Sequence, residues 1–160
     1  MRGSIATAIV ASFLAFGSGG AFAAGTSTTT ELTPAQVKTQ LAKAEGLIRA
    51  ENYDGAINVL KDIVDTNPRE ADAYNLLGFS YRKSKDYESA ERNYKRALRL
   101  NPDHKGALEY SGELYLETDR KELAKQQLAK LEKLCPSGCE ELDDLKRAFA
   151  SGGPTTKATW

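Results

Sequence analysis

The sequence repeats itself with a period of 34 residues, and this limits the available folds more than any other feature. Shifting the chain by one period aligns small residues, alanines and prolines in three copies: Ala44, Gly78 and Gly112; Ala56, Ala90 and Ala124; Pro68, Pro102 and Pro136. A period of about 20 to 50 residues is typical of stacked repeats in which each copy covers its neighbour. The chain is therefore predicted to contain three repeats, at about 37–70, 71–104 and 105–138.

Each copy has the pattern of two helices joined by a polar turn and closed by a proline. The polar turns are predicted at 52–55 in the first copy and at 85–88 in the second. Proline disfavours helical geometry in the residue before it, so Pro68 and Pro102 end the second helices. The first helix is predicted to begin at Thr33, which precedes a proline and has Gln36 three residues later, as in a capping box.

Two of the aligned small residues, Gly78 and Gly112, lie inside predicted helices. A glycine within a helix costs about 1 kcal/mol relative to alanine. We therefore expect Gly78 and Gly112 to lie where a partner helix approaches too closely for a side chain.

One more helix is predicted after the third copy, over 139–150. Its apolar residues occupy the positions of the first helix of a repeat, namely Leu142, Leu145 and Phe149. Lys146 stands at the position that Gly78 has in the second repeat. A long charged side chain fits there only if no further helix packs against it, so this helix is expected to cap the array.

The middle copy carries the most specific pattern. Its spacing is that of W-x2-L-G-x2-Y, A-x3-F and P, with other aromatics in the aromatic positions: Tyr74, Leu77, Gly78, Tyr81, Ala90, Tyr94 and Pro102. This pattern resembles the tetratricopeptide repeat, and the resemblance extends over Val37 to Gly138. It implies an all-α fold, a right-handed α-α superhelical solenoid of three helix-turn-helix repeats with a C-terminal capping helix.

The first residues differ in kind from the rest. Arg2 is followed by an uncharged apolar run from Ile5 to Phe16 and by an A-x-A triplet at 21–23, the pattern of a secretory signal peptide. The apolar run is shorter than the roughly 20 residues that span a bilayer. We expect a signal peptide at 1–23, a flexible linker at 24–33, the repeat domain at 34–150 and a disordered tail at 151–160. With the resemblance, this implies an exported, periplasmic bacterial protein.

Composition argues against several functions. Lys and Arg (22) balance Asp and Glu (22), so no overall field favours nucleic acid or an anionic membrane, and neither is expected as a partner of the mature chain. No catalytic motif or nucleotide fingerprint is apparent. The only histidine, His104, follows a proline and is expected in a solvated turn. We therefore expect no enzymatic activity, no cofactor and no metal.

Cys135 and Cys139 allow two interpretations. In an exported chain, an even number of cysteines favours a structural disulfide, here one that would attach the capping helix to the third repeat. Alternatively, Cys139 lies near a helix N-terminus, which lowers a thiol pKa, so the pair would serve a redox or metal-handling protein. The spacing C-x3-C does not match the redox motif C-x2-C.

The resemblance implies a function in protein–protein interaction, because a solenoid of this kind offers a groove lined by the first helix of each repeat. The implied groove residues are Leu41, Glu45, Arg49, Asn75, Phe79, Arg82, Lys83, Glu109, Glu113 and Glu117. Glu109 and Glu113 oppose an acidic peptide tail as the ligand. Phe79 is interpreted either as an anchor for a partner or as packing against the neighbouring first helix. The expected partner is a protein or peptide, with self-association as a further possibility.

Overall fold

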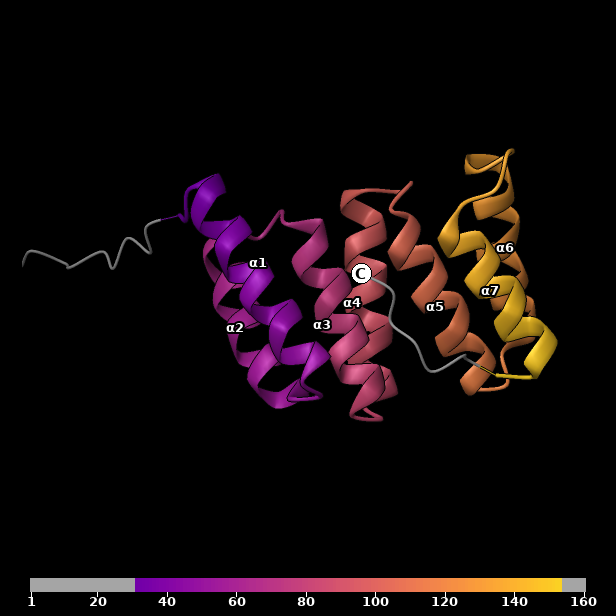
Figure 1. Cartoon of the computed structure of the whole chain (residues 1–160), viewed down its shortest axis with the longest axis horizontal. Coiled ribbons are helices and arrows are strands. Elements are labelled where there is room, and N and C mark those ends of the chain that lie inside the picture. Colours follow the sequence, from indigo (N-terminus) through magenta and orange to yellow (C-terminus); the bar gives the residue numbers. More distant parts are fainter. Residues whose placement is uncertain (1–30, 154–160) are drawn as a thin grey trace, which may run out of the picture.

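The structure is a computed structural model and describes residues 31–153 of the 160-residue chain. Seven α-helices follow one another over this range: α1 (Pro34–Arg49), α2 (Tyr53–Thr66), α3 (Ala71–Lys83), α4 (Tyr87–Leu100), α5 (Lys105–Glu117), α6 (Lys121–Leu134) and α7 (Glu140–Ser151). The helices stand side by side along the long axis of the molecule (Figure 1). No strand interrupts them between residues 31 and 153. The all-α helical repeat fold is thus confirmed.

Several predicted segments fall outside this range. The signal peptide at 1–23, most of the linker at 24–33 and the tail from residue 154 lie outside the described residues. Within residues 31–153, none of the helices combines the length and the apolar character that crossing a membrane requires.

The predicted capping box at the start of α1 is present. The hydroxyl of Thr33 accepts from the backbone N–H of Gln36 at 3.3 Å. The side-chain oxygen of Gln36 accepts in return from the backbone N–H of Thr33 at 2.9 Å. Two backbone donors that the helix leaves free are therefore satisfied at its first turn.

The turns inside the first two repeats are shorter than predicted at 52–55 and 85–88. The side chains of Asn52 and Asp86 accept from the backbone N–H group three residues later, at 2.9 and 3.0 Å. Both residues are therefore N-caps, and the residue after each already belongs to a helix. The sequence interpretation took these polar first turns for loop.

Gly78 and Gly112 both lie at close helix contacts, but with different partners. A Cβ atom on Gly78 would lie 2.6 Å from the ring of Tyr94, which belongs to the second helix of the same repeat. A Cβ atom on Gly112 would lie 2.7 Å from the side chain of Leu145. Leu145 belongs to α7, so the capping helix is the nearest neighbour at Gly112.

The capping helix therefore packs differently from the helices that precede it. Among the helices of the repeat that precedes each, α3 packs more on α2 than on α1 and α5 more on α4 than on α3, whereas α7 makes its larger contact with α5 and a smaller one with α6. Figure 1 shows α7 lying in front of α6 and beside α5. Leu142, Leu145 and Ala148 are buried in this contact, while Lys146 is exposed, as the cap interpretation expects.

The buried apolar residues form two clusters. One extends from α1 to α5 and includes the fully buried Leu60 and Tyr94. The other joins α5, α6 and α7 and includes the fully buried Leu131 and Leu145. Since α5 contributes to both clusters, it connects the first two repeats to the C-terminal part of the array.

Candidate binding surface

The predicted groove residues divide into two groups by exposure. Five of them retain exposed surface, namely Leu41, Glu45, Arg49, Lys83 and Glu117. The other five are buried, namely Asn75, Phe79, Arg82, Glu109 and Glu113, with 3 to 6% of their surface exposed. The structure brings this second group together between α3 and α5, so contacts across the helix pair decide what these side chains can do.

Phe79 is one of the buried residues and packs against the next repeat. Its ring meets that of Tyr110 on α5 edge-on, with 5.1 Å between centroids. The guanidinium of Arg82 lies 5.5 Å from the same ring. Phe79 has only 3% of its surface exposed. Of the two roles considered from the sequence, the structure therefore supports packing against the neighbouring first helix.

Arg82 links α3 to α5 through two carboxylates. Its guanidinium lies 2.6 Å from an oxygen of Glu113 and 2.7 Å from an oxygen of Glu117. The side chains of Arg82 and Glu113 are each only 4% exposed. Burial raises the pKa of Glu113, and the charge and hydrogen bond of Arg82 oppose this rise. The pair is therefore a desolvated ion pair in which each charge requires the other.

Glu109 lies one helical turn before Glu113 and has no such partner. It is 3% exposed, yet its carboxylate makes no hydrogen bond or ion pair to any residue between 31 and 153. Burial, together with the negative charges of Glu113 and Glu141, raises its pKa to about 8. Glu109 is thus an uncompensated buried acid.

A pocket of about 210 Å³ opens beside Glu109, where α3, α5 and the start of α7 meet. Its lining consists of Asn75, His104, Gly106, Glu109, Tyr110, Glu140 and Glu141, with three carboxylates and neither Lys nor Arg. The side-chain oxygen of Asn75 is buried without a hydrogen-bond partner. The pocket therefore presents hydrogen-bond acceptors and negative charge. We call it the acidic pocket.

His104 borders the acidic pocket and also fixes the start of α5. Its Nδ1 accepts from the backbone N–H of Ala107 at 3.2 Å, which makes His104 the N-cap of the helix. Its Nε2 lies 3.0 Å from a carboxylate oxygen of Asp72 on α3. The imidazole is 12% exposed, so the expectation of a solvated turn residue is wrong. Because it joins α3 to α5, His104 is a structural residue of the pocket wall.

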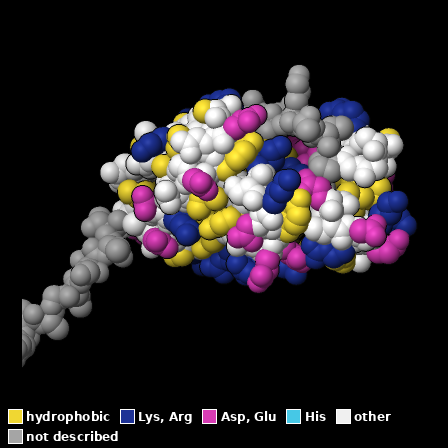
Figure 2. Space-filling model, turned by 90° about the horizontal axis from the view of Figure 1, so that it is seen from below, with side chains coloured by type: hydrophobic (Ala, Val, Ile, Leu, Met, Phe, Trp, Pro, Cys, Tyr) yellow, Lys and Arg dark blue, Asp and Glu magenta, His cyan; other side chains and the backbone are white. Residues whose placement is uncertain are grey.

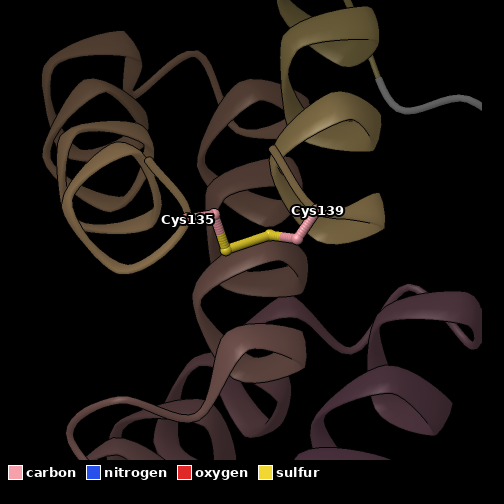
Figure 3. Close-up of a disulfide and its surroundings, with 2 residues drawn as sticks. All are labelled: Cys135 and Cys139. Carbon is pink, nitrogen blue, oxygen red and sulfur yellow. A yellow bond between two sulfur atoms is a disulfide. The ribbon is translucent and has the colours of Figure 1, made fainter. Parts of the chain in front are cut away.

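Cys135 and Cys139 form a disulfide, with 5.7 Å between their Cα atoms. Figure 3 shows the bridge crossing the loop between the end of α6 and the start of α7. Glu140 and Glu141 follow Cys139 directly, so the bridge constrains the segment that supplies two carboxylates to the acidic pocket. Between residues 31 and 153, no group of three His, Cys, Asp or Glu side chains is placed to hold a metal ion.

The outer surface has no single sign of charge over the face in Figure 2. Lysines and arginines are interspersed with acidic residues over the face seen from below. This distribution agrees with the equal counts of basic and acidic residues in the chain. A concentrated negative site such as the acidic pocket is therefore a local feature.

The stacked helix pairs place the chain among helical-hairpin repeat structures. Comparison with known proteins shows which kind of repeat it resembles. Residues 71–104 match the family model of the tetratricopeptide repeat. These bounds are those of the middle repeat predicted from the sequence. Over 72 residues, the chain is 33% identical to DnaJ protein P58IPK homolog B of Oryza sativa subsp. japonica. The match covers 45% of this chain and 15% of that protein, so the chain spans a small part of the relatives that it matches.

Solved structures show the same arrangement of helices. The first tetratricopeptide domain of Spaghetti (RPAP3), bound to the HSP90 peptide SRMEEVD, superposes with a TM-score of 0.64 at 20% identity, covering 75% of this chain and 98% of that one. The type III secretion translocator chaperone SycD of Yersinia enterocolitica gives a TM-score of 0.66 at 15% identity, covering 77% and 92%. At these identities the likeness establishes the fold.

Sequence reasoning missed part of the acidic pocket. It named Asn75 and Glu109 but not Glu140 or Glu141, because the resemblance placed the site on the first helices of the three repeats only. The paired acids directly after Cys139 were the available signal. Their relevance depends on α7 packing against α5, which the repeat pattern does not predict.

Proposed function

We propose that this protein is an interaction adaptor that binds a peptide or a segment of another protein along its first helices. The observation that carries this proposal is the acidic pocket, which takes residues from α3, α5 and α7 and therefore crosses successive units of the array. A site that follows the array in this way suits an extended segment, because successive side chains of the segment meet successive repeats.

Two further observations support binding along the first helices. Leu41 and Lys83 keep partly exposed side chains on α1 and α3. The structurally similar domain of Spaghetti (RPAP3) is described with a bound peptide of HSP90. The fold is therefore compatible with peptide capture, while the chemistry of the ligand has to follow from the side chains of this chain.

We further propose that the adaptor works after export, in a periplasm. The support is the signal-peptide pattern at 1–23 together with the disulfide between Cys135 and Cys139. Structural disulfides persist in oxidising compartments and are rare in the cytosol.

The test is photo-crosslinking from defined positions of the full chain in its own cells. A photoreactive amino acid replaces Leu41 or Lys83, and a third variant carries it at Glu122, an exposed residue of the second helix of the third repeat. The same adduct is expected from Leu41 and Lys83 and not from Glu122. The partner, identified by mass spectrometry, should then bind the purified protein with a measurable Kd.

Adducts of equal yield at all three positions, or no adduct at Leu41 and Lys83, would contradict binding along the first helices. An adduct between two copies of the chain would show self-association in place of an adaptor.

A further inference from the structure

We propose that the acidic pocket binds the cationic side chain of a lysine or arginine from the partner segment. This inference rests on the proposed function, since it specifies the chemistry of the segment that the adaptor binds. It concerns the junction of α3, α5 and α7, which joins the second and third repeats to the capping helix (Figure 1).

The chemistry of the lining selects a cation. Glu109, Glu140 and Glu141 contribute carboxylates, and no basic residue belongs to the lining. The ring of His104 accepts a backbone hydrogen bond through Nδ1, and its other nitrogen is directed to Asp72, so both ring nitrogens are engaged within the wall. An ammonium or guanidinium group supplies several N–H donors and no acceptor, which complements such a set.

Two buried polar groups in the pocket lack a partner. The oxygen of Asn75 is buried without a hydrogen bond, in a residue with 6% of its surface exposed. Glu109, with 3% exposed, makes no hydrogen bond or ion pair within residues 31–153. Buried polar groups are nearly always hydrogen-bonded, so unsatisfied ones require an explanation. A cation bound in the pocket and paired with the Glu109 carboxylate, with the Asn75 side chain beside it in the lining, provides it.

The neighbouring acid on α5, Glu113, has the cation partner that Glu109 lacks. Glu113, one turn further along α5, is buried to the same extent as Glu109 and is paired with Arg82 at 2.6 Å. Arg82 comes from α3 and is already engaged by Glu113 and Glu117. Of the three acids spaced by four residues along α5, Glu113 and Glu117 therefore have Arg82 as an internal cation. Glu109 has no such partner.

The charges around Glu109 come from each element of the junction. Glu113 on α5 and Glu140 and Glu141 on α7 face it as negative charges, and Arg82 on α3 is the positive charge nearby. Burial and these acids raise the pKa of Glu109 to about 8. A cation in the pocket stabilises the ionised carboxylate, so binding is expected to strengthen as pH rises through this range.

A ligand of the opposite charge is disfavoured by the same groups. An acidic peptide end would meet three carboxylates before it reached the ion pairs of Arg82. Like charges brought together across an interface cost several kcal/mol, which gives selectivity for the basic segment.

The experiment measures binding of defined peptides to the full chain by fluorescence anisotropy. The probes are three labelled glycine–serine peptides of equal length that carry two lysines, two norleucines or two glutamates. The lysine peptide is expected to bind at least about tenfold more tightly than the norleucine peptide. Binding of the glutamate peptide equal to that of the lysine peptide, or no binding of the lysine peptide at millimolar concentration, would overturn the proposal.

Variants locate the binding on the pocket. Glu109→Gln and Glu141→Gln each replace one carboxyl group at constant shape and, at about pH 9, where Glu109 is ionised, are expected to weaken lysine-peptide binding by roughly tenfold. Glu122→Gln is the matched control, because it makes the same change on exposed α6 surface and should leave the Kd unchanged. Thermal melts of each variant verify folding. Unchanged binding by both pocket variants would show that the cation binds elsewhere.

The pH dependence separates Glu109 from a general effect of charge. Between about pH 6.5 and about pH 9, binding of the lysine peptide is expected to tighten by roughly tenfold in the unmodified protein and by much less in Glu109→Gln. Equal pH profiles of the two proteins would exclude Glu109 as a ligand of the cation.

The proposed function and this inference can fail separately. If a partner is crosslinked from Leu41 and Lys83 but its Kd is insensitive to Glu109→Gln and Glu141→Gln, the adaptor stands and the cation site is wrong. If the lysine peptide binds as expected but no partner is crosslinked, the site stands and the adaptor is wrong.

Discussion

At the scale of single residues, Gly78 shows how the repeat depends on one missing side chain. A Cβ atom there would lie 2.6 Å from the ring of the fully buried Tyr94, which cannot withdraw without disturbing the core. At Gly46 in α1, the nearest atom to an added Cβ is the tip of the Arg49 side chain at 4.0 Å. The two glycines have the same helical conformation and different surroundings.

Alanine at these two positions should therefore act in opposite directions. Gly78→Ala is expected to lower the free energy of unfolding by about 1–3 kcal/mol through overpacking. Gly46→Ala is expected to raise it by about 0.5–1 kcal/mol, because alanine is the better helix former. Urea unfolding measures both, and stabilisation by Gly78→Ala would contradict the packing at Tyr94.

Glu109 makes the stability of the protein depend on pH. The folded protein keeps a proton on this carboxyl up to about pH 8, while the unfolded chain loses it near the ordinary pKa of 4.5. The folded state therefore binds more protons in this window, and stability falls as pH rises through it. Glu109→Gln removes the titration, so we expect it to stabilise the protein by about 1–3 kcal/mol at alkaline pH and by little at pH 5. Urea unfolding over this pH range measures the difference, and a gain that is independent of pH would contradict the raised pKa.

At the scale of helices, the buried ion pair of Arg82 connects α3 to α5. Arg82→Met leaves Glu113 buried and unpaired, which should cost about 3–5 kcal/mol. Adding Glu113→Gln should recover part of this loss, with a coupling energy of about 1–3 kcal/mol in a double-mutant cycle. Arg49→Met is the control, since Arg49 is 55% exposed and its ion pair with Glu45 should contribute little. Additive effects of the Arg82 and Glu113 changes would mean that the two side chains do not interact.

The disulfide between Cys135 and Cys139 holds the start of α7. Closing so short a loop stabilises the folded state by about 2 kcal/mol through the entropy of the unfolded chain. Reduction is therefore expected to lower the urea midpoint of the protein by a corresponding amount. The Cys135→Ser, Cys139→Ser double variant should unfold at that lower midpoint with or without reductant. Equal midpoints for the oxidised and reduced protein would show that the bridge does not stabilise α7.

The elements could be predicted from the sequence because they depend on local and periodic signals. Three prolines and three alanines in step define the hairpins, and the Thr33 capping box starts α1. The position of α7 could not be predicted in this way. The same pattern of Leu142 and Leu145 serves a helix that continues the array and one that moves onto α5, and only the contact of Leu145 with Gly112 distinguishes them.

The candidate site was also predicted only in part, because the repeat pattern places residues on helices but does not give the contacts between side chains of different repeats. The resemblance places Asn75, Arg82 and Glu109 on the first helices, and the structure finds them together between α3 and α5. It does not foresee that Arg82 pairs with Glu113 and leaves Glu109 unpaired, because this depends on distances between side chains of different repeats. Nor does it foresee Glu141, which reaches the pocket only through the packing of α7.

At the scale of the whole molecule, the array is a platform whose third repeat and capping helix carry the charged site. α5 belongs to both apolar clusters, so it holds Glu109 and Glu113 in a fixed position relative to α3 and α7. A site on rigid helices requires little ordering when a segment binds, which favours affinity for a short peptide. We therefore expect the partner segment to be recognised at the junction of α3, α5 and α7.

The most direct test of this claim is a ¹H–¹⁵N NMR titration of the full chain with the lysine peptide. We expect the amide signals of the pocket wall to shift most, including Gly106, Glu109 and Glu141, while those of α2 and the outer face of α6 stay in place. Shifts confined to α2, α4 and α6, or spread evenly over the chain, would contradict it.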